Sequence, residues 1–241
     1  MARSNRLLLI DLLRSLALLG MISYHLTYDL EMFGWLRPGT ATSGWFWLHA
    51  RLTAGGFIFL AGVSLCLANR DRIDWPKVWR REAKIAAAAA LVSLATYFAM
   101  PQAMIFYGIL HSIALSSLVG LAFLRLNFLV NLLIAAAVFA LPYYYSNAAL
   151  DGPLVWLGLS GRVPLTMDYQ PFFPWFAPML AGLATGQMIA KFGLPKALDL
   201  KPSPLRAALA WPSRHSLKIY LLHQPVLIAL VYAGSWLYWH M

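Results

Sequence analysis

The sequence predicts an all-α fold: a polytopic membrane helical bundle of about seven transmembrane helices, with a cytoplasmic N-terminus and the C-terminus outside. Three observations predict it. Of the 241 residues, 61% are hydrophobic and 12% are charged, whereas about a quarter of the residues of a soluble domain are charged. Apolar runs of transmembrane length follow one another along the chain, and Lys and Arg gather in the connections of one side. We expect a single transmembrane domain, residues 1–241.

Seven apolar segments approach the roughly 20 residues that a helix needs to cross the hydrocarbon core. They are residues 7–29, 52–69, 84–100, 105–125, 127–146, 172–191 and 216–238. The first segment begins like a signal peptide. It carries Asp11 and Arg14, however, and has no small-residue cleavage pattern, so we predict a retained helix.

The next segments show how neighbouring helices are joined and packed. Gly55, Gly56 and Gly62 in the second segment would allow the close approach of another helix or of an extended ligand, and helix packing is the commoner explanation. Pro101 and the step at residues 126–127 leave only short turns between neighbouring segments. Short turns predict antiparallel helical hairpins.

The orientation follows from the basic residues of the connections, because positive charges stay in the cytoplasm. Three lie on one side, Arg37, Arg51 and Arg162, and fourteen on the other. The fourteen are Arg3, Arg6, Arg70, Arg72, Lys77, Arg80, Arg81, Lys84, Arg125, Lys191, Lys196, Lys201, Arg206 and Arg214. The N-terminus is therefore predicted inside and the C-terminus outside. Compact loops and the lack of an organellar signal favour a bacterial inner membrane.

The charge and the cysteine content exclude several functions. The net charge of +10 could indicate a nucleic-acid partner, but the basic residues lie in short loops between apolar runs, so we predict none. Cys66 is the one cysteine, which excludes a disulfide and a thiolate metal cluster. The sequence also contains no glycine-rich phosphate loop, zinc-binding helix motif or nucleophile elbow. We expect no metal.

Ionisable residues in a transmembrane segment are costly, and four of them fall on one stripe of the first helix. Asp11 and Arg14 are three positions apart and can pair, and His25 follows Arg14 by eleven positions, close to three helical turns. Asp29 lies four positions after His25, so its carboxylate could orient the imidazole as a general base requires. The simpler alternative is a structural ion pair and an interfacial histidine.

Further histidines supply alternatives to His25. His111 lies in the fourth segment and His223 in the last, and a hydrogen bond to a neighbouring helix would explain either one. His49 and Arg51 are expected at the outer mouth of the second helix, within reach of His25.

The longest outer connection, roughly residues 147–171, is where an acceptor would be expected to bind. It contains Asp168, and Trp175 follows shortly after it. Acidic and aromatic residues suit a sugar, and they equally suit an interfacial lid.

Four motifs, in order along the chain, resemble a known family. They are Ile10–His25, in which ten residues separate Arg14 from His25, Phe59–Leu65, Tyr107–His111 and Ser216–Pro225. Together they resemble the bacterial transmembrane acyltransferases related to heparan-α-glucosaminide N-acetyltransferase. A more distant similarity is to the acyltransferase type three family.

The resemblance implies an acyltransferase that uses acetyl-CoA as the acyl donor from the cytoplasm. The acceptor would be an extracytoplasmic glycan or small sugar with a reactive hydroxyl or amine. The family pattern implies donor binding by Arg14, with Asp11 and His223 beside it, and catalysis by His25. We expect the bilayer and coenzyme A as partners, with a homodimer left open.

Three readings of the buried polar residues remain open. In an enzyme, His25 oriented by Asp29 would deprotonate the acceptor, while His111 or His49 steadies the oxyanion. In a proton-coupled transporter, Asp11, His25, His111 and His223 would form a relay across the bilayer. In a non-catalytic membrane subunit, the same residues would only fix helix packing. Transporters usually show inverted repeats and paired broken helices, and the absence of both favours the enzyme.

Overall fold

The computed structural model describes residues 2–240, with the side chains of residues 2–7 and 239 excepted, so the side chains of Arg3 and Arg6 lie outside the described residues. The chain divides into two compact units, and the division falls within helix α2 (Gly44–Ala68). One unit contains residues 1–57 and 195–241, and the other contains residues 58–194. Each unit is described by itself below.

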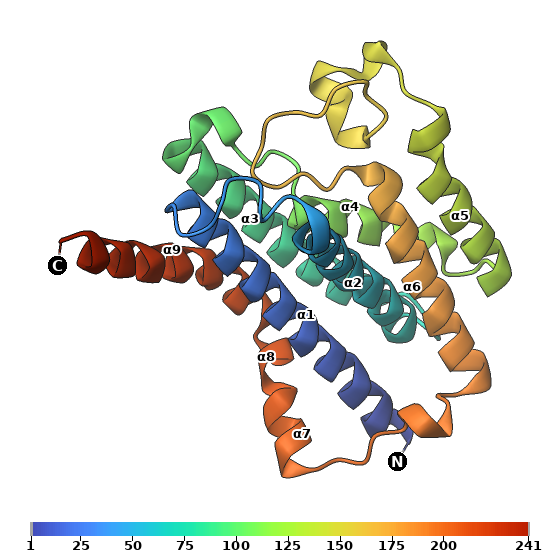
Figure 1. Ribbon diagram of the computed structural model, residues 1–241. Coiled ribbons are helices and arrows are strands. Elements are labelled where there is room, and N and C mark those ends of the chain that lie inside the picture. The colour runs from blue at the N-terminus through green and yellow to red at the C-terminus, as the bar shows by residue number, and fades with distance from the viewer. Residues whose placement is uncertain (1, 241) are drawn as a thin grey trace. The chain divides into compact units, whose positions relative to one another are not determined.

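The first unit is built on helix α1, which contacts the three C-terminal helices of the chain. Its helices are α1 (Ala2–Met32), the first part of α2, η5 (Lys196–Leu198), α7 (Pro204–Leu209), α8 (Trp211–Arg214) and α9 (Ser216–His240). The short helices α7 and α8 lie beside α1, and α9 meets α1 further along its length (Figure 1).

The contacts between α1 and α9 follow the same order along both helices. The ring of Phe33, just after α1, lies 6.2 Å from that of Tyr232. Two residues on, Trp35 Nε1 donates a hydrogen bond of 2.8 Å to Ser235 Oγ. Later residues of one helix meet later residues of the other, so the two helices run in the same sense.

The second unit contains the rest of α2 and the helices up to α6. They are α3 (Trp75–Ala99), η1 (Pro101–Ala103), α4 (Ile109–Gly120), η2 (Leu121–Phe123), α5 (Phe128–Tyr144), η3 (Ala148–Leu150), η4 (Gly152–Leu157) and α6 (Phe172–Phe192). Helix α6 packs along α5 and also contacts α4, which in turn contacts α3 (Figure 1). The core of this unit is centred on α6, where Met179, Leu180 and Leu183 have no exposed surface.

Glycines bring α2 and α6 into backbone contact. A Cβ atom on Gly62 would lie 2.2 Å from the carbonyl oxygen of Met179, and one on Gly182 would lie 2.0 Å from that of Phe59. Side chains are therefore excluded at both positions, and the helices meet through their main chains. Of the two explanations for Gly62 given by the sequence, helix packing is the one the structure shows.

All seven predicted segments are helical, and four helices are long and apolar enough to cross a membrane among the described residues. These four spans are Leu8–Met32, Gly44–Ala68, Trp75–Ala99 and Ser216–Tyr238, with shorter apolar helices at Ile109–Phe123 and Phe128–Tyr144. The count of seven spans and the orientation remain predictions.

Three predicted boundaries were wrong. Helix α2 begins at Gly44, so His49 and Arg51 lie within the helix, and their place at its outer mouth stays a prediction. Helix α3 begins at Trp75, because Asp74 caps its N-terminus by accepting the Lys77 N–H and proline occupies the first turn. Helix α4 starts only at Ile109.

Candidate functional site

A buried polar cluster lies where α9 meets α1, inside the first unit. Gln224 Nε2 donates a hydrogen bond of 2.7 Å to Asp29 Oδ1, and the Asp29 side chain has no exposed surface. The second oxygen of each group, Asp29 Oδ2 and Gln224 Oε1, is buried and has no hydrogen-bond partner within the part of the chain that the structure describes. An unpaired buried polar atom costs about 1–3 kcal/mol, so several in one place indicate a position that can bind a polar ligand.

Two histidines meet next to this pair. The ring centroids of His25 and His223 are 4.8 Å apart, with the rings edge to face. His223 Nδ1 lies 2.5 Å from the Tyr220 carbonyl oxygen, which can only accept, so this nitrogen carries the proton. His223 Nε2 therefore has a free lone pair, and it is buried with no hydrogen-bond partner among the described residues. The cluster contains one imidazole nitrogen that can accept a hydrogen bond from a ligand.

Local sequence explains how α9 presents these groups. Pro225 lies inside α9 directly after Gln224. Proline has no N–H and its ring clashes with the preceding turn, so the regular helical hydrogen bonds are interrupted at this point. Such interruptions at membrane depth are tolerated where polar side chains are gathered. The proline of α9 and the polar cluster therefore lie at the same place along the helix.

An aromatic ring connects His49 to the same cluster. The Tyr24 ring lies 5.6 Å from the His25 ring and 6.4 Å from the His49 ring. His49 Nε2 lies 2.7 Å from the carbonyl oxygen of Gly20, to which it donates, so this histidine also holds α2 against α1. His25 and His49 each lie next to the Tyr24 ring, and a contribution of His49 to the site of His25 stays a prediction.

The structure gives Asp29 a different partner from the predicted one. Asp29 was expected to orient His25, but among the described residues its hydrogen bond goes to Gln224. The physical reason is geometric. Asp29 lies four positions after His25 and shares its face of α1, but that face adjoins α9, so both side chains can find partners there. Asp29 fixes Gln224, and His25 instead contacts His223.

Arg14 and Arg51, the two arginines predicted for the site, each contact another side chain of their own helix. Arg14 Nη1 lies 3.5 Å from Asp11 Oδ1, and 30% and 24% of the two side chains are exposed. This pair has the predicted spacing and is partly solvated or lipid-facing rather than buried. Arg51 lies over the Trp47 ring of its own helix, 3.7 Å from the centroid.

His111 lies in the second unit and both of its ring nitrogens are in use. Nδ1 accepts the Gly108 N–H at 3.2 Å, in the first turn of α4. Nε2 lies 3.3 Å from Ser93 Oγ, whose own proton goes to the Ile105 carbonyl oxygen at 2.6 Å, so Nε2 is the donor. The imidazole is neutral and caps a helix, and a second proton on it would break the bond from Gly108.

Asp168 binds the start of the same helix. Its Oδ2 accepts the Ile109 N–H at 2.8 Å and its Oδ1 accepts from Gln170 at 3.2 Å. A Cβ atom on Gly108 would lie 2.3 Å from Asp168 Oδ2, which explains why this position is a glycine. Burial raises the pKa of the Asp168 carboxyl above its ordinary value, and the two hydrogen bonds oppose part of that rise. The carboxylate predicted to bind an acceptor also accepts the first N–H of α4, next to the N-cap residue Gly108.

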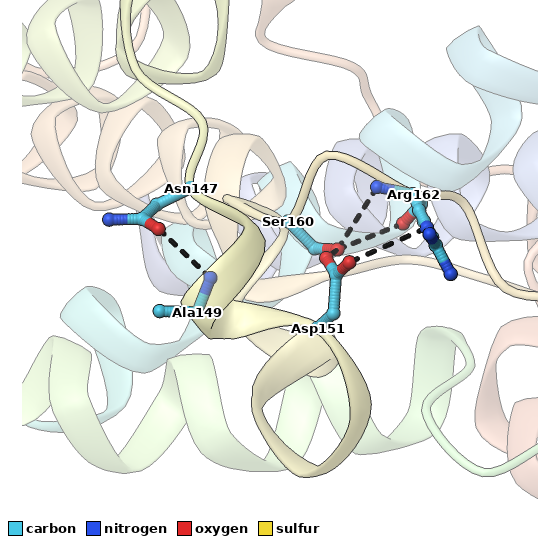
Figure 2. Close-up of polar contacts among 5 residues, drawn as sticks. All are labelled: Asn147, Ala149, Asp151, Ser160 and Arg162. Atoms are coloured by element: carbon cyan, nitrogen blue, oxygen red, sulfur yellow. Dashed lines mark hydrogen bonds and ion pairs between the residues drawn. The ribbon is translucent and has the colours of Figure 1, made fainter.

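The connection at residues 147–171, which is predicted to lie outside, has an ordered structure of its own. Asp151 binds Ser160 through its side chain and lies 3.6 Å from Arg162 Nε, which closes this part of the connection (Figure 2). Aromatic packing also orders it, because the Trp156 ring lies 5.6 Å from the Tyr107 ring. Trp175, the other acceptor candidate, lies half-buried in the first turn of α6.

Sequence reasoning missed two members of the cluster. Gln224 and Tyr24 are uncharged, and neither stood out in an apolar helix that contains many similar residues. The one available signal was position, since Gln224 lies between His223 and a helix-interrupting proline. Among the described residues, no group of three or more His, Cys, Asp or Glu side chains is arranged to hold a metal ion.

The long apolar helices and the ionisable cluster between two of them define an integral, multi-pass membrane protein. The model of one protein family, described as heparan-alpha-glucosaminide N-acetyltransferase, catalytic, matches residues 6–225. The chain belongs to this family, as the four sequence motifs predicted. Comparisons with curated proteins and with solved structures find no match. The similarity to the acyltransferase type three family remains a prediction.

Proposed function

We propose that this protein is a membrane-embedded acyltransferase with His25 as the general base. It would move an acetyl group from cytoplasmic acetyl-CoA to a sugar hydroxyl or amine outside the cytoplasm. The observation that carries the proposal is the contact between His25 and His223 among buried, unpaired polar atoms. The family's description as a catalytic N-acetyltransferase supports a transfer reaction.

In this reaction the imidazole of His25 takes the proton of the acceptor as its oxygen or nitrogen attacks the thioester carbonyl carbon. The new bond forms, the carbon–sulfur bond breaks, and the leaving thiolate takes the proton from the imidazolium. The second ring affects the first: two imidazolium ions 4.8 Å apart would repel each other, so the pair holds one proton at a time. His223, whose Nδ1–H is fixed by Tyr220, keeps its lone pair available next to His25.

Asp29 and Gln224 take a supporting part in the proposal. Asp29 lies one helical turn from His25 on α1 and accepts a hydrogen bond from the side-chain amide of Gln224. Its hydrogen bond from Gln224 holds α9, and therefore His223, against α1. Both are positioning residues rather than proton carriers.

We further propose that the donor binds through Arg14 on the cytoplasmic half of α1, beside Asp11. The two units would work as one domain, because the family match from residue 6 to 225 passes through both. The bacterial inner membrane remains the proposed location, and a glycan or small sugar the proposed acceptor.

The transporter alternative receives less support from the geometry. A proton relay through His111 would require this ring to gain and lose protons. Its two nitrogens are already committed to Gly108 and Ser93, and a proton on Nδ1 would uncap α4.

The experiment is acyl transfer in proteoliposomes. Vesicles containing the purified protein are given acetyl-CoA labelled in the acetyl group on one face and an amino sugar or sugar alcohol mixture on the other. Labelled products are identified by mass spectrometry. Acetylated product that requires both the protein and donor on the cytoplasmic face supports the proposal. Coenzyme A that neither raises the thermal midpoint of the protein nor supports any transfer contradicts it.

A further inference from the structure

A cavity in the second unit collects positive charge from three separate elements. Its volume is about 250 Å³, and its charged lining residues are Arg70, Arg125 and Lys191. Arg70 follows the end of α2, Arg125 follows η2, and Lys191 lies in the last turn of α6. None of the three has a carboxylate within ion-pair distance among the described residues, and no acidic side chain lines the cavity.

A simpler explanation of these charges is the helix dipole, since cations are favourable near C-terminal helix ends. In the structure, however, side-chain amides donate hydrogen bonds to backbone carbonyl groups in this region. Gln187 Nε2 donates to the carbonyl oxygens of Leu124 at 3.1 Å and Leu126 at 2.8 Å, and Asn69 Nδ2 donates to that of Leu65 at 2.9 Å. Amide groups therefore satisfy these carbonyls at the end of α2 and after η2, which leaves Arg70 and Arg125 available to the cavity. The Nζ atom of Lys191 lies 5.1 Å from the centroid of the Phe192 ring and adds its charge at the edge of the cavity.

The wall of the cavity is also held in place before any ligand binds. Gln187 Oε1 accepts a hydrogen bond of 3.0 Å from Asn131 Nδ2, and the Asn131 side chain is fully buried. Gln187 therefore links α6, α5 and the chain after η2. A prearranged wall reduces the ordering cost of binding.

We infer that this cavity is a binding site for a phosphate group. Guanidinium groups bind phosphate oxygens through paired, charge-assisted hydrogen bonds, and a lysine adds a point charge. The volume is below the roughly 300–1,000 Å³ of pockets that enclose a whole drug-sized ligand, so the cavity suits a charged group rather than a complete nucleotide. The phosphate belongs either to a soluble nucleotide or to an anionic lipid, which both present the same chemistry.

The inference is independent of acyl transfer at His25, and binding alone tests it. In the first arm, the thermal midpoint of the purified protein in neutral detergent is measured with adenosine 3′,5′-bisphosphate. In the second arm, native mass spectrometry counts phosphatidylglycerol and phosphatidylcholine molecules retained by the protein. A midpoint shift identifies a soluble phosphate, and preference for phosphatidylglycerol identifies a lipid head group.

Substitutions decide whether the cavity is responsible. Arg125→Gln should weaken binding of the effective probe roughly tenfold or more, as expected for one lost charge-assisted contact. The triple variant with Arg70→Gln and Lys191→Gln added should abolish it. Arg80→Gln removes an exposed charge that does not line the cavity and should leave binding unchanged.

Two outcomes would overturn the inference. One is wild-type protein that responds to neither probe. The other is Arg80→Gln weakening binding as much as Arg125→Gln, which would indicate general charge attraction. If the triple variant does not fold, Arg125→Gln alone still tests the inference. Its thermal midpoint without ligand is compared with that of the wild type to show that it is folded.

Discussion

The side-chain amide of Gln224 donates to the carboxylate of Asp29 across 195 positions of sequence. This bond brings the last helix to the first and places His223 beside His25. The polar cluster is therefore produced by the pairing of α1 with α9, and substitutions there separate chemistry from packing.

The first prediction is that His25→Ala abolishes turnover and leaves the fold intact. A missing general base typically lowers the rate by about 10²–10⁴. We expect acyl transfer to fall by at least that factor, while expression, thermal midpoint and coenzyme A binding stay close to wild type. His240→Ala, which changes an exposed histidine at the end of α9, serves as the control.

Two related variants locate the proton acceptor. Asp29→Asn should be milder than His25→Ala, because it leaves both imidazole rings in place. If His25→Ala transfers acyl groups at an undiminished rate, His25 is structural. His223, with its free Nε2, would then be the base to test.

The second prediction concerns Arg14 in α1, the residue that we propose for donor binding. Its contact with Asp11 is partly exposed, and such ion pairs contribute only about 0–1 kcal/mol. Arg14→Ala should therefore insert and fold while binding coenzyme A more weakly. Asp11→Asn removes the same ion pair but keeps the guanidinium, so it should bind the donor normally. Isothermal titration in detergent measures both, and equal losses in the two variants would assign the arginine a structural role.

The third prediction tests the contact between α2 and α6. Gly182→Ala would place a Cβ atom 2.0 Å from the Phe59 carbonyl oxygen, and neither backbone can move aside without separating the helices. We expect the free energy of unfolding to fall by about 1–3 kcal/mol or more. In Gly56→Ala the new Cβ meets no atom within 4 Å, and alanine is the better helix former by roughly 1 kcal/mol. Opposite signs of the change in thermal midpoint would support this contact, whereas equal changes would not.

The fourth prediction is a pH dependence from Asp168, whose pKa is raised by burial. In the window above the ordinary aspartate pKa of about 3.9, the folded state binds more protons at this group than the unfolded state. Its contribution to stability is therefore largest at acidic pH and is lost as the pH rises through the folded pKa. Asp168→Asn should flatten the dependence of the thermal midpoint on pH in this window. Asp151→Asn, in the outer connection, should leave that dependence in place.

The fifth prediction is the topology. A reporter fused after Met241 should behave as periplasmic, and one inserted in the connection at residues 69–74 as cytoplasmic. A cytoplasmic signal from the C-terminal fusion would remove one span and overturn the assigned orientation.

The sequence predicted every long helix because apolar runs of bilayer length have few alternatives. It misjudged where α3 begins, because the first turns carry Trp79, Arg80 and other residues that resemble a loop. The capping signal was nevertheless present in Asp74 and the proline that follows Trp75. Boundaries are set by such local bonds rather than by hydropathy.

Sequence reasoning proposed His25 for the site and paired it with Asp29, whereas the structure shows His25 in contact with His223. The 3.6-residue period identifies which residues share a face of one helix, and it says nothing about which helix adjoins that face. Asp29 and His25 do share a face, but the partners of both come from α9, almost the whole chain later. His111 and Asp168 were candidates for the site because of their charge, and the structure places them as caps of α4.

The pairing of the first helix with the last also affects how the protein is made. Ribosomes add about 5–20 residues each second, so Asp29 is synthesised roughly ten to forty seconds before Gln224. During that interval a carboxylate that is fully buried in the finished protein has no amide to bind. The insertion machinery, or water near the membrane surface, must accommodate the charge until α9 arrives. A nascent chain that stops before α9 would present an unmet acidic group in its first helix, a feature that membrane quality control can recognise.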